Sequence, residues 1–108
     1  MKRIYLFCSA GMSTSMLASS MQKAADQHKL PLEVQAFPDG KIGQIMEELH
    51  PDVILLGPQV KFRYKEINQR FGDQVPVAVI DAGDYGMMNG EKVLKFAIKL
   101  LKAKETEG

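Results

Sequence analysis

The sequence predicts an α/β fold, an open and doubly wound sheet of four parallel strands flanked by helices. Three short runs are apolar at successive positions, which is typical of strands that helices cover on both faces; they span residues 3–7, 53–57 and 75–81. Stretches of helical periodicity lie between these runs, so strands and helices alternate along the chain. Alternation with short connections implies right-handed crossovers between parallel strands.

A fourth apolar run, residues 32–37, alternates apolar with polar side chains. Alternation indicates a strand with only one buried face, as at the edge of a sheet. We therefore expect this strand at an edge. In such a sheet, ligands bind beyond the carboxyl ends of the strands, near the point where the strand order reverses. The loop after residues 3–7 is the natural place for a site.

Four helices are predicted from apolar spacing and from start and stop signals. The first begins at an N-cap on Ser13 or Thr14 and runs to about His28, with Leu17, Met21, Ala24 and Ala25 facing inward. A second is marked by Ile42, Ile45, Met46 and Leu49 and ended by Pro51. The others span about residues 62–71 and 91–104.

Composition indicates one ordinary globular domain over residues 1–108, with a tail at 103–108 that we expect to fray. A formal net charge of +1 gives no electrostatic case for nucleic-acid binding. One cysteine forms no internal disulfide, which favours a reducing cytoplasm. We see no targeting segment and no apolar stretch that spans a bilayer, so any role at a membrane requires a partner.

The loop after the first strand combines a thiol with small and hydroxyl residues. Cys8 ends the apolar run, and it is followed by Ser9, Ala10, Gly11, Met12, Ser13, Thr14 and Ser15. Gly11 permits a positive φ, so successive N–H groups can curl around an anion. A helix N-terminus adds unpaired N–H groups and partial positive charge. The pattern predicts a cradle for a phosphate group.

The same features bear on the Cys8 thiol. A cysteine that faces a helix N-terminus has its pKa lowered from about 8.5 into the range ~3.5–7.5, which makes it a thiolate at neutral pH. A thiolate beside bound phosphate oxygens is a nucleophile aimed at phosphorus. The alternative to a catalytic role is a structural one, in which Cys8 is an inert thiol at the end of a strand and the loop only caps a helix.

Two other functions use a loop of this kind. A small cysteine phosphatase or arsenate reductase carries an Arg six positions after the nucleophile to clamp the phosphate. That position is Thr14 here, and residues 8–22 contain no Arg or Lys. The loop therefore favours relay of a phosphoryl group over its hydrolysis. A flavin mononucleotide carrier and a non-catalytic regulatory module remain as alternatives.

The motifs resemble those of a known family. The segments that carry the resemblance are "IYLFCSAGMSTSML", "AFP", "DVILLGPQV", "VAVID" with "YG" after it, and "VLKFAI". They occur in order over essentially the whole chain. The sequence is similar to the enzyme IIB component of the bacterial sugar phosphotransferase system, in its lactose/cellobiose class, and "CSAGMSTS" is specific to the cellobiose/chitobiose/lichenan branch.

The resemblance implies both a reaction and partners. Cys8 would accept a phosphoryl group from a phosphohistidine of enzyme IIA and pass it to a β-glucoside or disaccharide entering through the membrane enzyme IIC. The phosphate loop would comprise Ser9 to Ser15. The fold would be the one that low-molecular-weight cysteine phosphatases have, with no metal or other cofactor. The protein would be cytoplasmic and peripheral to the inner membrane through enzyme IIC.

Residues outside the loop are candidates for the site edge or for partner contact. Gln59 follows a strand end and is placed either to donate to phosphate or to cap the next helix. Asp81 ends the last strand, where a helix-cap role is favoured over one at the phosphate, and Tyr85 follows it. The methionines Met12, Met87 and Met88 suit an adaptable apolar rim for a docking protein.

Overall fold

The computed structural model describes the backbone of residues 1–9 and 11–107 and the side chains of residues 1–9 and 14–104. Four strands form one sheet: β1 Lys2–Cys8, β2 Leu32–Pro38, β3 Val53–Leu56 and β4 Val77–Val79. Their order is β2-β1-β3-β4, and every pair is parallel. The predicted sheet is confirmed, with β1 in the interior and β2 at an edge.

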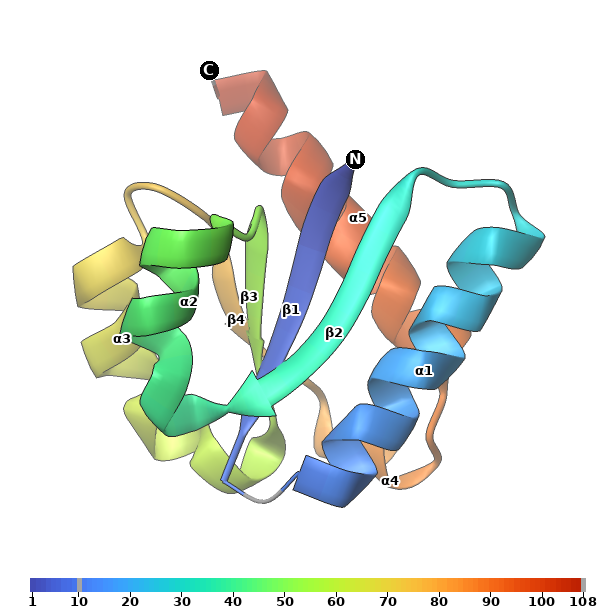
Figure 1. Ribbon diagram of the computed structural model, residues 1–108, viewed down its shortest axis with the longest axis horizontal. Coiled ribbons are helices and arrows are strands. Elements are labelled where there is room, and N and C mark those ends of the chain that lie inside the picture. Colours follow the sequence, from blue (N-terminus) through green and yellow to red (C-terminus); the bar gives the residue numbers. More distant parts are fainter. Residues whose placement is uncertain (10, 108) are drawn as a thin grey trace.

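The longer helices are α1 Gly11–Gln27, α2 Ile42–Leu49, α3 Tyr64–Phe71 and α5 Gly90–Glu107. Shorter helical segments follow three of the strands: η1 Asp39–Lys41, η2 Pro58–Arg63 and α4 Ala82–Gly86 (Figure 1). The sequence does not predict α4 or η1, because segments this short show no helical periodicity.

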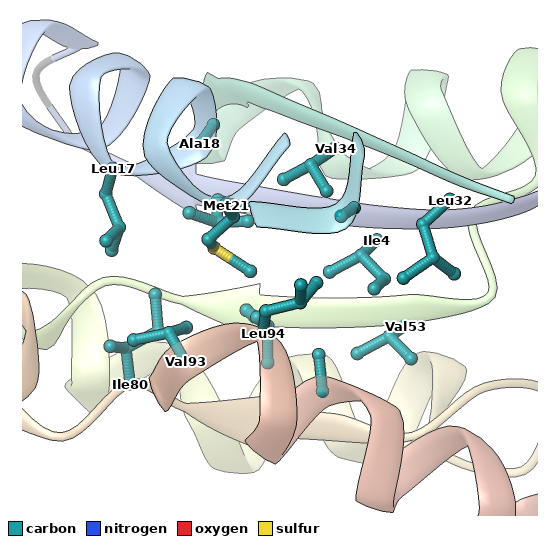
Figure 2. Packing of buried hydrophobic residues seen from close by; sticks show 14 of the residues in the cluster. Ile4, Leu17, Ala18, Met21, Leu32, Val34, Val53, Ile80, Val93 and Leu94 are labelled. Carbon is teal, nitrogen blue, oxygen red and sulfur yellow. The ribbon is translucent and has the colours of Figure 1, made fainter. Parts of the chain in front are cut away.

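Two hydrophobic cores cover the two faces of the sheet. Four successive side chains of β1, residues 4–7, are fully buried, and they alternate between the cores. Ile4 and Leu6 pack with apolar side chains of α1 and α5, as Figure 2 shows for Ile4 among Met21, Val34 and Leu94. Tyr5 and Phe7 pack on the other face with α2 and α3. The apolar run of β1 is uninterrupted because helices bury this strand on both faces of the sheet.

The helices α1 and α5 approach each other closely where α5 begins. A Cβ on Gly90 would lie 2.8 Å from the backbone nitrogen of Met21 and would also meet the side chain of Ser20. Only glycine fits this contact, so Gly90 fixes where the two helices of this layer meet.

Two expectations at the ends of helices are wrong. The first helix begins at Gly11, ahead of the predicted N-cap at Ser13 or Thr14, because the connection from β1 is shorter than expected. Gly11 therefore belongs to a helix, and no described glycine has a positive φ. At the other end, α5 continues to Glu107, beyond the predicted end at about residue 104, and the Lys104 ammonium donates to the Asp73 carbonyl at 3.1 Å.

Two elements near the sheet edge also differ from their predicted bounds. Strand β4 covers only Val77–Val79 of the predicted 75–81, although the Ile80 N–H still donates to the Leu56 carbonyl at 2.8 Å. The third helix is preceded by η2, which starts at Pro58, and its α-helical part begins at Tyr64, not at residue 62.

The strand order locates the switch point of the sheet. The chain leaves β1 through α1 toward β2 and then crosses to β3 on the other side of β1. The crevice beyond the carboxyl ends of β1 and β3 is where such sheets bind ligands. The start of α1, η2 and α4 lie together along this edge, at the bottom of Figure 1.

Candidate functional site

Cys8 is the last residue of β1, at the switch point. The Phe7 residue before it pairs with Leu56 of β3, and the Gly57 N–H donates to the Phe7 carbonyl at 2.8 Å. These bonds hold the turn after β3 directly beside Cys8. The Cys8 side chain is only 2% exposed.

Gln59 of η2 contacts the sulfur. The Cys8 Sγ lies 3.3 Å from the Gln59 Oε1, in the geometry of a thiol that donates to the amide oxygen. Gln59 is exposed while Cys8 is buried, so the Gln59 side chain reaches the sulfur from the solvent side. The structure thus brings these two predicted residues together across 51 positions of the chain.

Gly57 provides the space for this contact. A Cβ at Gly57 would lie 3.2 Å from the Cys8 sulfur and 2.9 Å from the Gln59 Oε1. Its backbone, with φ −63° and ψ 153°, is one that any residue adopts. The glycine is therefore required for close approach and not for an unusual conformation.

The structure describes some of the residues in the loop that follows Cys8. Ser9 is exposed directly after the sulfur, and Ser15 is exposed in the first turns of α1. Ala10 lies outside the described residues, as do the side chains of Gly11, Met12 and Ser13. Because α1 begins at Gly11, the unpaired N–H groups of its first turn and its positive dipole end follow closely after Cys8.

Thr14 turns its hydroxyl into the protein. Its side chain is 1% exposed, and its Oγ1 lies 2.9 Å from the hydroxyl of Tyr85, which is itself buried in α4. Either hydroxyl can be the donor. This bond occupies the Thr14 hydroxyl away from solvent.

Removing this hydroxyl pair is expected to destabilise the fold by a modest amount. Thr14→Val and Tyr85→Phe should each lower the free energy of unfolding by about 1 kcal/mol, since each removes one buried hydrogen bond. The double variant should cost little more than either single one, because the bond is already lost. Urea unfolding of the four proteins measures this, and fully additive losses would contradict a direct bond.

Asp81 caps α4. Its Oδ2 accepts from the Asp84 N–H at 3.1 Å, and its carbonyl accepts from the Tyr85 N–H at 2.9 Å. The helix-cap role predicted for Asp81 is confirmed. Through this cap, Asp81 helps to hold Tyr85 against Thr14, although it does not contact the sulfur itself in any bond described here.

Large apolar side chains are exposed along the same edge. Phe62 of η2 is 77% exposed, Met87 after α4 is 78% exposed, and Met16 of α1 is 59% exposed. Met87 was identified from the sequence, but the same prediction is wrong for Met88, which is partly buried and packs against the core next to α1 and α5. Phe62, which was assigned to a helix, and Met16 were missed. An aromatic residue three positions after Gln59 and flanked by Lys61 and Arg63 was the available signal.

Arg63 is a structural residue of this edge. Its Nη1 lies 2.8 Å from the Asp39 Oδ2 and its Nη2 lies 3.0 Å from the Glu66 Oε2. Hydrogen bonds with Glu66 and Asp39 raise the pKa of Arg63, and the bond from Arg63 lowers the pKa of Glu66. Arg63 thus joins η2 to η1. Its positive charge is balanced by the carboxylates of Asp39 and Glu66.

Among the residues that the structure describes, no group of His, Cys, Asp and Glu side chains is arranged to hold a metal ion. Over the same residues, no helix has the length and apolar character needed to cross a membrane.

Comparison with known proteins decides the family. Residues 3–96 match the family model described as PTS system, Lactose/Cellobiose specific IIB subunit. The chain belongs to this family. As a IIB subunit it is a phosphotransferase component, one that carries phosphate to sugar, and its fold is the low-molecular-weight-phosphatase-like fold of such domains.

Named relatives of this IIB subunit cover nearly its whole length. The galactose-specific EIIB component of Lactococcus lactis subsp. cremoris (strain MG1363) and the cellobiose-specific EIIB component of Lactococcus lactis subsp. lactis (strain IL1403) are each 44% identical over 104 residues, which is 93% of this chain and 96% of the relative. A solution structure of the cellobiose-specific IIB component from Borrelia burgdorferi superposes with a TM-score of 0.77 at 36% identity, covering 95% of this chain and 94% of that one.

Proposed function

We propose that Cys8 is the phosphoryl carrier of this IIB subunit. It accepts the phosphoryl group from a phosphohistidine of enzyme IIA and passes it to a sugar that enters through the membrane enzyme IIC. The observation that carries the proposal is the position of the chain's one cysteine, at the switch point of the sheet and just before the N-terminus of α1.

The first transfer moves the phosphoryl group from the phosphohistidine of enzyme IIA to Cys8. The Cys8 thiolate attacks phosphorus, the S–P bond forms, and the bond between phosphorus and the donor's imidazole nitrogen breaks. The donor ring leaves as neutral imidazole, because its other nitrogen carries a proton. The positive end of the α1 dipole favours both the thiolate and the arriving phosphoryl group. In the second transfer a sugar hydroxyl attacks phosphorus, the O–P bond forms and the S–P bond breaks. The Cys8 sulfur leaves as a thiolate and takes up the proton that the hydroxyl gives up, which restores the thiol.

The backbone of the loop is proposed to hold the phosphoryl oxygens. The proposed donors are the N–H groups of Ser9, Ala10, Gly11, Met12 and Ser13. The N–H of Ser15 belongs to the hydrogen-bonded part of α1, which begins at Gly11. The exposed hydroxyls of Ser9 and Ser15 are close by in the chain. Because the loop has no acidic side chain, no carboxylate within it repels the phosphoryl group.

Hydrolysis of a phosphocysteine is disfavoured because this chain has a threonine at the position where a cysteine phosphatase carries an Arg. Thr14 stands six residues after Cys8, and its hydroxyl is turned to Tyr85. Residues 8–22 have no Arg or Lys that could clamp the phosphate for attack by water. A phosphocysteine in this loop therefore persists long enough for transfer, which suits a relay and not a phosphatase.

The sugar is proposed to be a β-glucoside or disaccharide of the cellobiose type. Two of the proteins named above are cellobiose-specific, while a relative of equal identity is galactose-specific. Sugar contacts are expected chiefly on enzyme IIC, so the IIB sequence constrains the sugar weakly. The same partner would hold this subunit at the cytoplasmic face of the inner membrane.

The test is transfer from phosphorylated enzyme IIA of a lactose/cellobiose-class system. The wild-type chain should take up one phosphoryl group that alkali removes, and it should release it to sugar when membranes with enzyme IIC are added. It should turn over an aryl phosphate at a negligible rate. Rapid aryl phosphate hydrolysis without uptake from enzyme IIA would favour the phosphatase alternative and contradict the relay.

The exposed apolar side chains of the site edge are expected to contact enzyme IIA. Phe62→Ala should weaken binding by about tenfold, because Phe62 is a largely exposed aromatic ring on η2, the segment that carries Gln59, and aromatic rings are typical binding hot spots. The concentration of enzyme IIA at half-maximal transfer rate measures this. Phe96→Ala on α5, where Phe96 is 38% exposed, is the matched control. If Phe62→Ala and Phe96→Ala bind enzyme IIA equally well, Phe62 is not part of the interface.

A further inference from the structure

We propose that the Gln59 side chain is a movable cap on Cys8, which covers the sulfur in the resting protein and turns to donate hydrogen bonds when the phosphoryl group arrives. The proposal rests on the relay function proposed above and assigns a catalytic residue to it. The Gln59 side chain touches the reacting atom, and Gln59 is an exposed residue.

The contrast in burial supports the cap. Cys8 is 2% exposed, yet the Gln59 side chain that contacts its sulfur at 3.3 Å is exposed. A phosphoryl group that approaches from the side of Gln59 therefore meets this side chain before it meets the sulfur. For in-line attack on phosphorus, this side chain has to move aside or take part.

The chemistry of the amide explains why it has to turn. In the resting protein the thiol donates to the Gln59 Oε1. A thiolate or a phosphorylated sulfur has no proton to donate, and the amide oxygen would then face other acceptors. Rotation of the amide group exchanges Oε1 for Nε2, whose two N–H groups are donors. The same side chain can thus accept from the thiol and donate to the phosphoryl oxygens.

The backbone beneath Gln59 is fixed, so motion is confined to the side chain. Pro58 occupies the start of η2, and the Val60 N–H donates to the Gly57 carbonyl at 3.0 Å. Val60 itself is fully buried in the core shared with α2 and α3. Gly57 adds no side chain that would separate Gln59 from Cys8, since a Cβ there would crowd both.

The test uses Gln59→Ala with Gln69→Ala, at an exposed position of α3, as the matched control. Alkylation of Cys8 by the neutral reagent iodoacetamide is measured as a function of pH. The rates are compared on the acid side of the thiol's ionisation, where the thiol still donates to the Gln59 Oε1, after each rate has been divided by the fraction of thiolate. Removal of the cap should make this reaction several-fold faster. Phosphoryl uptake from enzyme IIA should instead become about 10- to 100-fold slower, because a hydrogen bond to a charged group is lost.

These opposite changes separate the cap from a general disturbance of the site. Gln59→Glu should slow phosphoryl uptake more than Gln59→Ala, since a carboxylate cannot donate and repels the phosphoryl group. Alkylation or uptake at the wild-type rate in Gln59→Ala would overturn the proposal. If the wild-type chain and Gln69→Ala both fail to take up phosphoryl groups, the relay function fails, and the alkylation rates still report whether Gln59 covers Cys8.

Discussion

Replacing Cys8 by Ser is expected to abolish phosphoryl uptake from enzyme IIA, with a loss of at least about a thousandfold. A serine hydroxyl is not ionised at neutral pH and needs a base to become a nucleophile. Gln59, whose side chain contacts the Cys8 sulfur, is not a base. The substitution exchanges one atom at a buried position, so the fold should be retained.

The measurement is the phosphoryl group transferred to the variant in a timed reaction, compared with the wild type. Ser9→Ala is the control, because it removes a hydroxyl from the exposed neighbour and leaves the thiol in place. Its uptake should fall far less than that of Cys8→Ser. Uptake by Cys8→Ser at a rate near that of the wild type would show that the acceptor is another residue.

The second large effect is expected from Gly57→Ala. The new Cβ would lie 3.2 Å from the Cys8 sulfur and 2.9 Å from the Gln59 Oε1, so both side chains have to shift. Overpacking of a site this tight costs about 1–3 kcal/mol of stability. Phosphoryl uptake should fall by about tenfold as well, because the Gln59 amide is displaced and the sulfur shifts by a fraction of the ångström that costs about a hundredfold.

Gly40→Ala in η1 is the matched control, since a Cβ there meets nothing within 4 Å. Its uptake and its unfolding midpoint in urea should equal those of the wild type. If Gly57→Ala also behaves as the wild type does, then the contact between Cys8 and Gln59 has no part in the reaction.

Much of the fold could be predicted because burial on two faces leaves a clear pattern. The uninterrupted apolar runs identified β1, β3 and β4, and the alternating run identified β2 as an edge strand. Helical spacing identified α1, α2, α3 and α5, with errors of a few residues at their ends. Cys8 was identified as a site residue because a strand end, small residues and a helix start coincide there.

The rest could not be predicted because it depends on contacts between distant residues. The hydroxyls of Thr14 and Tyr85 meet across 71 positions, and nothing in the local sequence indicates that Thr14 points inward. Gly57 looks like an ordinary turn residue until the Cys8 sulfur is placed beside it. Arg63 looks like a solvated charge, whereas Asp39 and Glu66 bind it.

The most direct test of the central claim is to locate the transferred phosphoryl group by tandem mass spectrometry. The chain is phosphorylated by enzyme IIA, digested under conditions that preserve thiophosphate and phosphoramidate bonds, and sequenced. The relay mechanism predicts one phosphoryl group, on Cys8. A phosphoryl group on His28, on His50 or on a serine of the loop, with Cys8 unmodified, would contradict it.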